Sequence, residues 1–163
     1  MTHIEADSLV GAWQLQRWEI VRETDHEDGA VSEPFGPGAA GLLLYTADGW
    51  MSASIMAAGR PRLSRDNPRA AATAERAAAF DGYFGYAGRW SLADGQVRHE
   101  VTVALNPAMV GTLQLRAARL TGRTLTLSAE EAVPGGIRRH QLRWRRPARR
   151  GMSLQAAKER RQR

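Results

Sequence analysis

Short apolar segments separated by glycine-containing turns run through most of this chain, and this pattern is the feature that most restricts its fold. Asp-Gly at residues 48–49 and 94–95 supplies the positive backbone φ that a tight hairpin turn requires. Thr-Gly at 121–122 and Pro-Gly-Gly at 134–136 are further turn signals. The pattern predicts eight successive strands, at residues 9–21, 40–46, 50–57, 83–93, 96–104, 111–121, 123–129 and 137–145.

Eight antiparallel strands in succession form an up-and-down sheet, and such a sheet usually hides its edges by closing on itself. With 163 residues, 43% of them apolar and 25% charged, the chain has the length and composition of one soluble globular domain. We therefore predict an all-β fold, a closed antiparallel up-and-down barrel over residues 1–146 with one inserted α-helix. Incomplete closure would leave strand edges exposed and favour a homodimer.

The segment between the third and fourth predicted strands departs from this pattern and predicts the inserted helix. Asn67 is placed to cap a helix that begins at Pro68, an alanine-rich stretch follows, and Gly82 stands just past its end. Residues 57–82 are long for a simple connection. We expect this segment to form a lid or plug at the barrel.

The net charge of +6 is concentrated at the C-terminal end of the chain. Residues 147–163 hold six basic side chains and one acidic side chain, so residues 1–146 carry a net charge of only +1. A barrel of that charge has little electrostatic attraction for nucleic acid, and we predict no specific nucleic-acid partner. We expect the tail at 147–163 to be disordered and to act as a solubilising terminus.

Several kinds of site are disfavoured by what the chain lacks. It has no cysteine, and therefore no disulfide, thiolate zinc site or cysteine nucleophile. His3, His26, His99 and His140 lack the spacing of a compact metal site, and no phosphate-binding loop, dinucleotide fingerprint or nucleophile elbow is present. We predict no metal and no cofactor. No leader pattern or bilayer-length apolar run is present, so we expect no membrane partner and a cytoplasmic location.

The first and last predicted strands contain residues that resemble the barrel closure of known proteins. A Gly-Ala-Trp sequence ending at Trp13 opens the first strand, and Arg143 and Arg145 stand on the last. This arrangement resembles the barrel closure of lipocalins and their relatives. It implies that Trp13 plugs the barrel floor and that a basic side chain of the last strand, Arg143 or Arg145, packs across its ring. An arginine over an indole ring gains about 0.5 to 2 kcal/mol.

The wider sequence resembles the bacterial lipocalin-like domain family. The motifs LVGAWQL, SEPFGPGAAGLLLYTADGWMSASIM, AFDGYFGYAGRW, VRHEV, VGTLQLR and LTGRTLTLS occur in the family's order and cover about residues 9–146. The resemblance implies an antiparallel calycin-type barrel with a central cavity for a small apolar molecule. It does not imply one reaction, since similar barrels include enzymes that cyclise polyketide or alkaloid intermediates.

Strand alternation places a histidine among side chains that face the predicted cavity, because Val97, His99 and Val101 share one face of their strand. In the functional interpretation, His99 donates a hydrogen bond to a bound carbonyl or hydroxyl, or exchanges a proton with it, helped by the Tyr86 phenol. In the other interpretation, His99 is a core histidine satisfied by a backbone carbonyl or a tyrosine. The preceding strand presents three aromatic side chains to the same space, Phe84, Tyr86 and Trp90.

The first strand allows two assignments of its faces. If it is regular, Arg17 and Glu19 share the inward face of Trp13 and form a buried ion pair, which is costly. A bulge would instead switch the faces, bring Trp18 inside and leave both charges solvated. We favour the bulge, which makes Trp18 a candidate ligand contact.

The strand at 111–121 is also ambiguous. We expect Leu113 and Leu115 to form its core face, which leaves Gln114 and Arg116 in solvent. In a ligand-binding barrel this choice can reverse. Arg116, with its planar donor fork, is then a candidate to bind an enolate or carboxylate.

The candidate residues fall into two groups. The catalytic candidates are His99, Tyr86 and Arg116. The ligand-binding candidates include Met51 and Ile55 as an adaptable apolar lining. The ligand-binding set as a whole is Trp18, Met51, Ile55, Phe84, Trp90, Val101 and Gln114.

The favoured hypothesis for function is a cofactor-independent cyclase or isomerase of natural-product, polyketide-like biosynthesis. Such an enzyme holds a small hydrophobic metabolite near its reacting shape in a dry lumen, with one or two hydrogen bonds to a developing charge. The alternative is a non-catalytic carrier of such a molecule. A third hypothesis is an interaction module with a filled barrel, since eight strands enclose space for only one small ligand.

Overall fold

The computed structural model describes residues 4–24 and 28–148, so residues 149–163 of the predicted tail, His3 and His26 lie outside the described residues. The described chain is mostly strand. Its elements are α1 (Ala6–Leu9), β1 (Gly11–Thr24), β2 (Asp28–Ser32), β3 (Ala40–Tyr45), β4 (Trp50–Met56), the 3-10 helix η1 (Pro68–Ala70), α2 (Thr73–Asp81), β5 (Tyr83–Ala93), β6 (Gln96–Ala104), the 3-10 helix η2 (Pro107–Met109), β7 (Leu113–Thr121), β8 (Thr124–Val133) and β9 (Gly136–Arg145).

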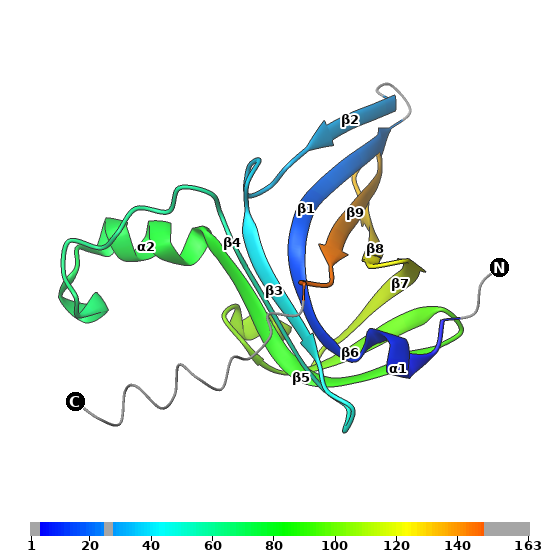
Figure 1. Cartoon of the computed structure of the whole chain (residues 1–163). Helices are drawn as coiled ribbons and strands as arrows, with labels where there is room; N and C mark the ends of the chain where they lie inside the picture. The colour runs from blue at the N-terminus through cyan, green and yellow to red at the C-terminus, as the bar shows by residue number, and fades with distance from the viewer. Residues whose placement is uncertain (1–3, 25–27, 149–163) are drawn as a thin grey trace, which may run out of the picture.

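The strands form a closed antiparallel barrel, which confirms the predicted fold (Figure 1). Consecutive strands from β3 to β9 pair as neighbours, and β1 pairs with both β3 and β9, which completes a ring of eight. The described chain has a ninth strand, β2, which pairs with the far end of β1 and stands outside the ring. None of the eight predicted strands covers its residues. Pairing with β1 determines that this short segment is extended.

A bulge in β1 decides which side chains of this strand face the barrel interior. Leu15 is opposite Trp144 and Arg17 is opposite Arg143, so the register of β1 with β9 shifts at Gln16. As favoured from the sequence, the faces switch there and Trp18 turns inward. Arg17 stays half-exposed and forms ion pairs with Glu19 at 3.0 Å and with Glu33 at 2.5 Å.

The barrel floor is built around Trp13, as predicted, but a different arginine covers it. Arg143 and Arg145 are exposed, because Trp144 points inward and its neighbours on β9 must then point outward. Arg146, just past the strand, lies with its guanidinium carbon 4.2 Å from the centroid of the Trp13 ring. Its two terminal nitrogens donate to the backbone carbonyls of Ser8 and Val10. The prediction of Arg143 or Arg145 as the covering residue was therefore wrong.

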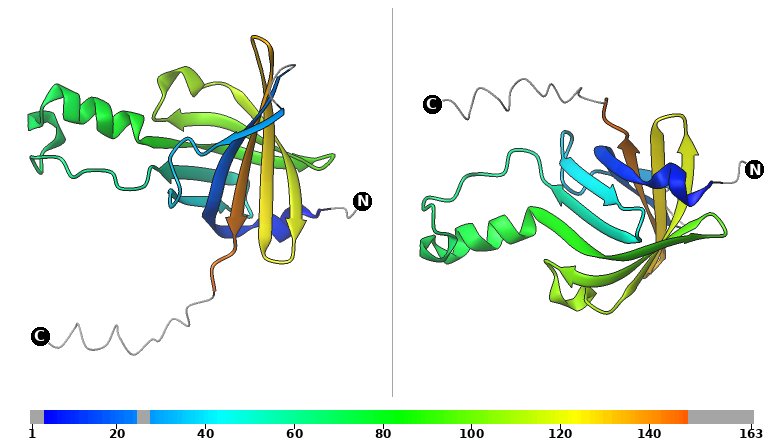
Figure 2. Two further views of the ribbon diagram at one scale, coloured as in Figure 1. Left: turned by 90° about the horizontal axis from the view of Figure 1, so that it is seen from above. Right: turned by 60° about the horizontal axis from the view of Figure 1, so that its bottom comes forward.

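Below Trp13, the short helix α1 lies across the end of the barrel at which β1 begins (Figure 2). The indole nitrogen of Trp13 donates to the Leu9 carbonyl at 2.8 Å, and both side chains are fully buried. This contact joins the helix to the barrel floor and closes the lower end of the core.

The inserted segment holds one α-helix, as predicted, but the helix begins later and does not cover the barrel. Asn67 caps η1 instead, and the chain extends again at Ala71 before α2 begins at Thr73. The Glu75 carboxylate accepts from the backbone nitrogen of Ala72 at 3.0 Å, which starts a new helix there. No residue of α2 is buried, and the helix projects away from the barrel beyond β4 and β5 (Figures 1 and 2). The prediction of a lid or plug was wrong.

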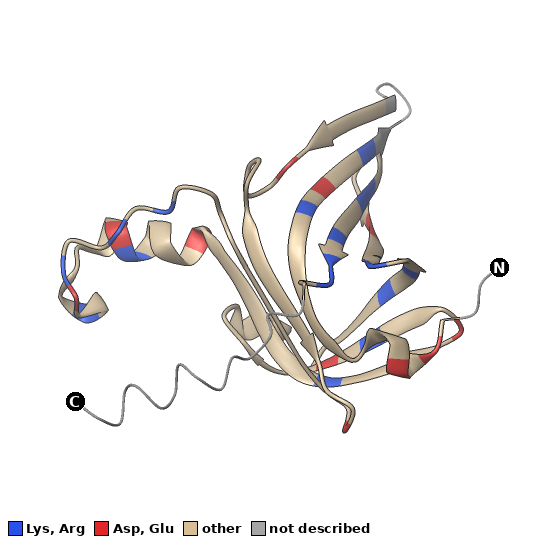
Figure 3. Ribbon diagram, viewed as in Figure 1, with Lys and Arg blue, Asp and Glu red and all other residues tan. Residues whose placement is uncertain are grey.

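Charged residues are unevenly distributed over the barrel. β3 and β4 contain no lysine, arginine, aspartate or glutamate, whereas β1, β7, β8 and β9 contain several (Figure 3). The acidic and arginine side chains that line the interior cavity are Arg116 of β7 and Glu130 and Glu131 of β8.

Within the described ranges, no helix is both long and apolar enough to cross a lipid bilayer.

Candidate functional site

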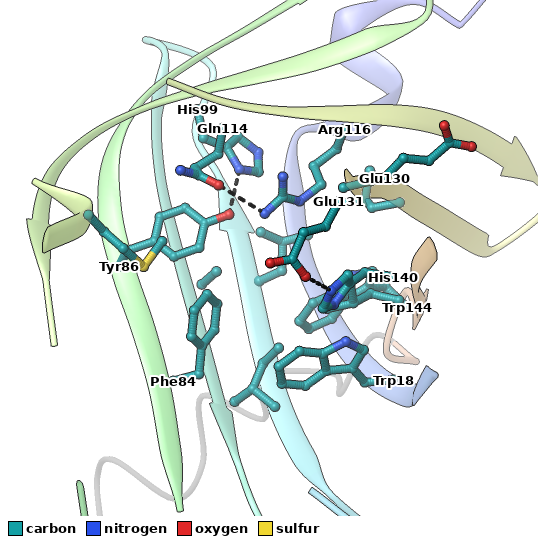
Figure 4. A pocket seen from close by; sticks show the side chains of 17 residues that line it. Trp18, Phe84, Tyr86, His99, Gln114, Arg116, Glu130, Glu131, His140 and Trp144 are labelled. Carbon is teal, nitrogen blue, oxygen red and sulfur yellow. Dashed lines mark hydrogen bonds and ion pairs between the residues drawn. The ribbon is translucent and has the colours of Figure 1, made fainter. Parts of the chain in front are cut away.

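A cavity of about 520 Å³ lies inside the barrel, in the size range of small-molecule sites. It reaches the surface at Glu130 and Glu131, which line it and are exposed. Figure 4 shows the side chains around it. The lining consists of Trp18, Leu43, Ala53, Ile55, Phe84, Tyr86, His99, Met109, Gln114, Arg116, Leu127, Ala129, Glu130, Glu131, His140, Leu142 and Trp144.

One wall of the cavity is aromatic and aliphatic. Trp18, brought inside by the bulge in β1, lies 5.8 Å from Phe84 between ring centroids and meets Phe35 edge-on at 5.1 Å. Phe84 in turn packs edge-on against Tyr86. The indole nitrogens of Trp18 and Trp144 are buried and have no hydrogen-bond partner among the described residues. This wall suits a flat apolar molecule.

His99 stands between two tyrosines, and both of its ring nitrogens are hydrogen-bonded. Nε2 is 2.8 Å from the hydroxyl of Tyr45, and Nδ1 is 2.7 Å from the hydroxyl of Tyr86. Only 1% of the His99 surface is exposed. Burial, together with the nearby Arg116 charge, lowers the pKa of His99 to about 3. Burial also raises the pKa of both Tyr45 and Tyr86. All three groups are therefore neutral at ordinary pH.

Arg116 and Gln114 of β7 face this group, and the expected orientation of the strand was wrong. Leu113 and Leu115 are 50% and 42% exposed, whereas Gln114 and Arg116 line the cavity. Arg116 donates to the Leu115 carbonyl at 2.8 Å and to the Gln114 amide oxygen at 3.3 Å. The register of β6 with β7 explains the orientation, because it pairs Gln114 with the inward-facing His99. Figure 4 shows Tyr86, Gln114 and Arg116 pointing toward one another beside His99.

The acidic side chains near the cavity opening already have basic partners. The Glu131 carboxylate is 3.4 Å from Nε2 of His140 and 4.0 Å from Arg138. Glu130 pairs with Arg139 at 3.0 Å. Among the described residues, no three histidine, aspartate or glutamate side chains come together in a way that fits a metal ion. The guanidinium of Arg116, by contrast, has no carboxylate within 4.0 Å in the described chain.

Most of the predicted site residues lie together around this cavity. The lining contains all three catalytic candidates, and four of the seven ligand-binding candidates, Trp18, Ile55, Phe84 and Gln114. Met51, Trp90 and Val101 are buried in the solid core and do not reach the cavity. The Trp90 ring lies 4.5 Å from the Tyr45 ring between centroids, and its indole nitrogen donates to the Thr46 carbonyl. These two contacts hold Trp90 in the core.

Tyr45 is one of the residues around the site that were not among the predicted candidates. It is 54 positions from His99 in the chain. Alternation along 40–46 puts Leu43 and Tyr45 on one face, which is a signal for burial, but it names no partner. His140 was considered only as a metal ligand. Its place in the lining follows from the inward face of β9, shared with Leu142 and Trp144.

Comparison with known families adds to the geometry. A lipocalin-like domain matches residues 10–147. The chain belongs to the lipocalin-like domain family. In general terms, this membership implies binding of a small molecule by the lipocalin-like barrel. A search of curated proteins gave no significant match.

Proposed function

We propose that this lipocalin-like protein binds a small, mainly apolar molecule in the barrel cavity, with Trp18 and Phe84 against its apolar body. One observation carries the proposal. A cavity of about 520 Å³ is apolar along β3–β5, yet it contains an arginine, Arg116, with no carboxylate partner among the described residues. Arg116 is partly buried and its hydrogen bonds go to Leu115 and Gln114 of its own strand, so its charge is available to an anionic group of a bound molecule.

The test uses the fluorescent probe anilinonaphthalene sulfonate and two variants of β8. Ala129 lines the cavity, and Ala132 is exposed on the same strand outside the lining. We expect Ala129→Trp to fill the cavity and weaken probe binding at least about 10-fold, while Ala132→Trp binds like the wild type. Equal binding by the two variants would place the probe outside the barrel and contradict the proposal.

A second candidate is the cyclase or isomerase activity predicted from the sequence. It is supported by the position of the Tyr86 hydroxyl and the Arg116 guanidinium beside an apolar cavity, where donors stabilise negative charge that develops on an oxygen. His99 itself has both nitrogens occupied by tyrosines, so Tyr86 is the better candidate for contact with a reacting group.

Native mass spectrometry of the protein from its own host, followed by chromatography of the released molecule, separates an enzyme from a carrier. For an isomerase or a cyclase we expect the retained compound to convert to a product of equal mass during incubation, and Tyr86→Phe to slow this conversion at least about 10-fold. Recovery of one unchanged compound after long incubation would support a carrier instead.

A further inference from the structure

The hydrogen-bond chain through His99 has a direction, and the direction follows from counting protons. A neutral imidazole carries one N–H and one lone pair. One of the two tyrosines must therefore donate to His99 and the other must accept from it. Burial holds the pKa of His99 near 3, so the doubly protonated ring, which would donate to both, is not formed at neutral pH.

The surroundings of Tyr45 determine which of the two tyrosines donates to His99. Its surface is 2% exposed, it does not line the cavity, and His99 is its one hydrogen-bond partner among the described residues. If Tyr45 accepted a proton from Nε2, its own O–H would be buried without an acceptor, which is costly. If Tyr45 donates to Nε2, its proton is satisfied. Nδ1 of His99 must then carry the ring proton and donate to the Tyr86 oxygen.

Tyr86 differs from Tyr45 in that it lines the cavity. When its oxygen accepts from Nδ1, its own hydroxyl proton has no acceptor among the described residues and is free to point into the cavity. Arg116 adds guanidinium N–H groups on the same side. The Gln114 amide oxygen accepts from Arg116, and the Gln114 amide nitrogen donates to Thr112 at 2.9 Å, so both ends of this amide are already hydrogen-bonded.

We propose that the Tyr45–His99–Tyr86 chain holds the Tyr86 hydroxyl as a hydrogen-bond donor toward the cavity, and that Tyr86 and Arg116 together select a ligand with a carboxylate or enolate oxygen on an apolar body. The ligand class rests on the proposed function of the cavity. A ligand with an ammonium group at this end meets the positive charge of Arg116 and the Tyr86 donor, and therefore binds more weakly than a carboxylate. Tyr45 is a positioning residue, because it acts through His99 without touching the ligand.

The first test needs no ligand. In ligand-free protein, ¹⁵N NMR of the histidine side chains distinguishes a protonated from a bare ring nitrogen. We expect His99 to show a protonated Nδ1 and a bare Nε2, and Tyr45→Phe to weaken this preference. A protonated Nε2 in the wild type would overturn the proposal, whatever the cavity binds.

The second test compares 2-naphthoate with 2-naphthylmethylammonium, which share an apolar body, by calorimetry. We expect the carboxylate to bind at least about 10-fold more tightly, and Tyr86→Phe or Arg116→Gln to remove about 10-fold of its affinity. Tyr45→Phe should also weaken naphthoate binding several-fold. Tyr83→Phe is the matched control, since Tyr83 lies on the same strand as Tyr86 but outside the lining, and it should bind like the wild type.

The outcomes separate this inference from the proposed function. Equal affinity for the two naphthyl compounds would overturn the ligand class while leaving cavity binding intact. Failure of both compounds and of the fluorescent probe would overturn cavity binding and the ligand class with it, and the NMR result would still decide the direction of the chain.

Discussion

At the scale of single residues, His99 shows how burial converts a titratable group into a neutral structural one. Its ring is almost fully buried, and burial with the Arg116 charge lowers its pKa from the ordinary value of 6.5 to about 3. In the unfolded chain the same ring binds a proton near pH 6.5. Between these two values the unfolded state binds more protons than the folded state. Acid therefore favours unfolding over this range, and stability is regained as pH rises.

We expect the free energy of unfolding to fall by about 2 kcal/mol more in the wild type than in His99→Gln when the pH is lowered from 6.5 to 5. Urea denaturation at several pH values measures this difference. Parallel pH dependence in the two proteins would show that His99 takes up no extra proton on unfolding.

At the scale of elements, bulges shift the register between neighbouring strands of the barrel at two places. One lies in β1 at Gln16 and lets Trp18 reach the cavity. The other lies where β5 meets β6, between Ala87 and Gly88, and there the backbones approach closely. A Cβ atom at position 88 would lie 1.8 Å from the carbonyl oxygen of Glu100. Only glycine fits this crossing without movement of the backbone.

For this reason we expect Gly88→Ala to lower the free energy of unfolding by about 3 kcal/mol through overpacking. Ser91→Ala, at an exposed position of the same strand, should change it by less than about 0.5 kcal/mol. Urea denaturation of both variants checks this. A Gly88→Ala variant as stable as the wild type would mean that the bulge relaxes without cost.

At the scale of the whole molecule, the barrel depends on contacts between the two ends of the described chain. β1 pairs with β9 along most of its length, and Arg146 ties Ser8 and Val10 to the Trp13 ring. These contacts remove the free edges of the eight-stranded ring and seal the floor below the cavity. The cavity can stay open at one end because the other end is solidly packed.

Substitutions at the barrel floor should show, by their effect on the free energy of unfolding, which arginine covers Trp13. We expect Trp13→Ala to cost about 3 to 5 kcal/mol and Arg146→Ala about 2 kcal/mol, whereas Arg143→Ala and Arg145→Ala should each cost less than about 0.5 kcal/mol. Thermal and urea unfolding provide the measurement. A larger loss for Arg143→Ala or Arg145→Ala than for Arg146→Ala would contradict the assigned closure.

Much of the site could be predicted because alternation along a strand is a local property. Val97, His99 and Val101 share a face whatever the barrel does around them, and the turns at 48–49 and 94–95 place neighbouring strands side by side. The sequence alone therefore determined the class of fold, most of its strands, and the inward direction of His99 and Tyr86.

Only the tertiary structure decided which residues meet. The register of β6 with β7 turned Arg116 inward against the expectation from its leucine neighbours. The path of the chain past β9 brought Arg146, and not Arg143 or Arg145, onto the Trp13 ring. Ring closure brought Tyr45 to His99 across 54 positions of sequence. Register, bulges and closure depend on pairing between distant segments, and a side-chain pattern within one segment carries no information about its distant partner.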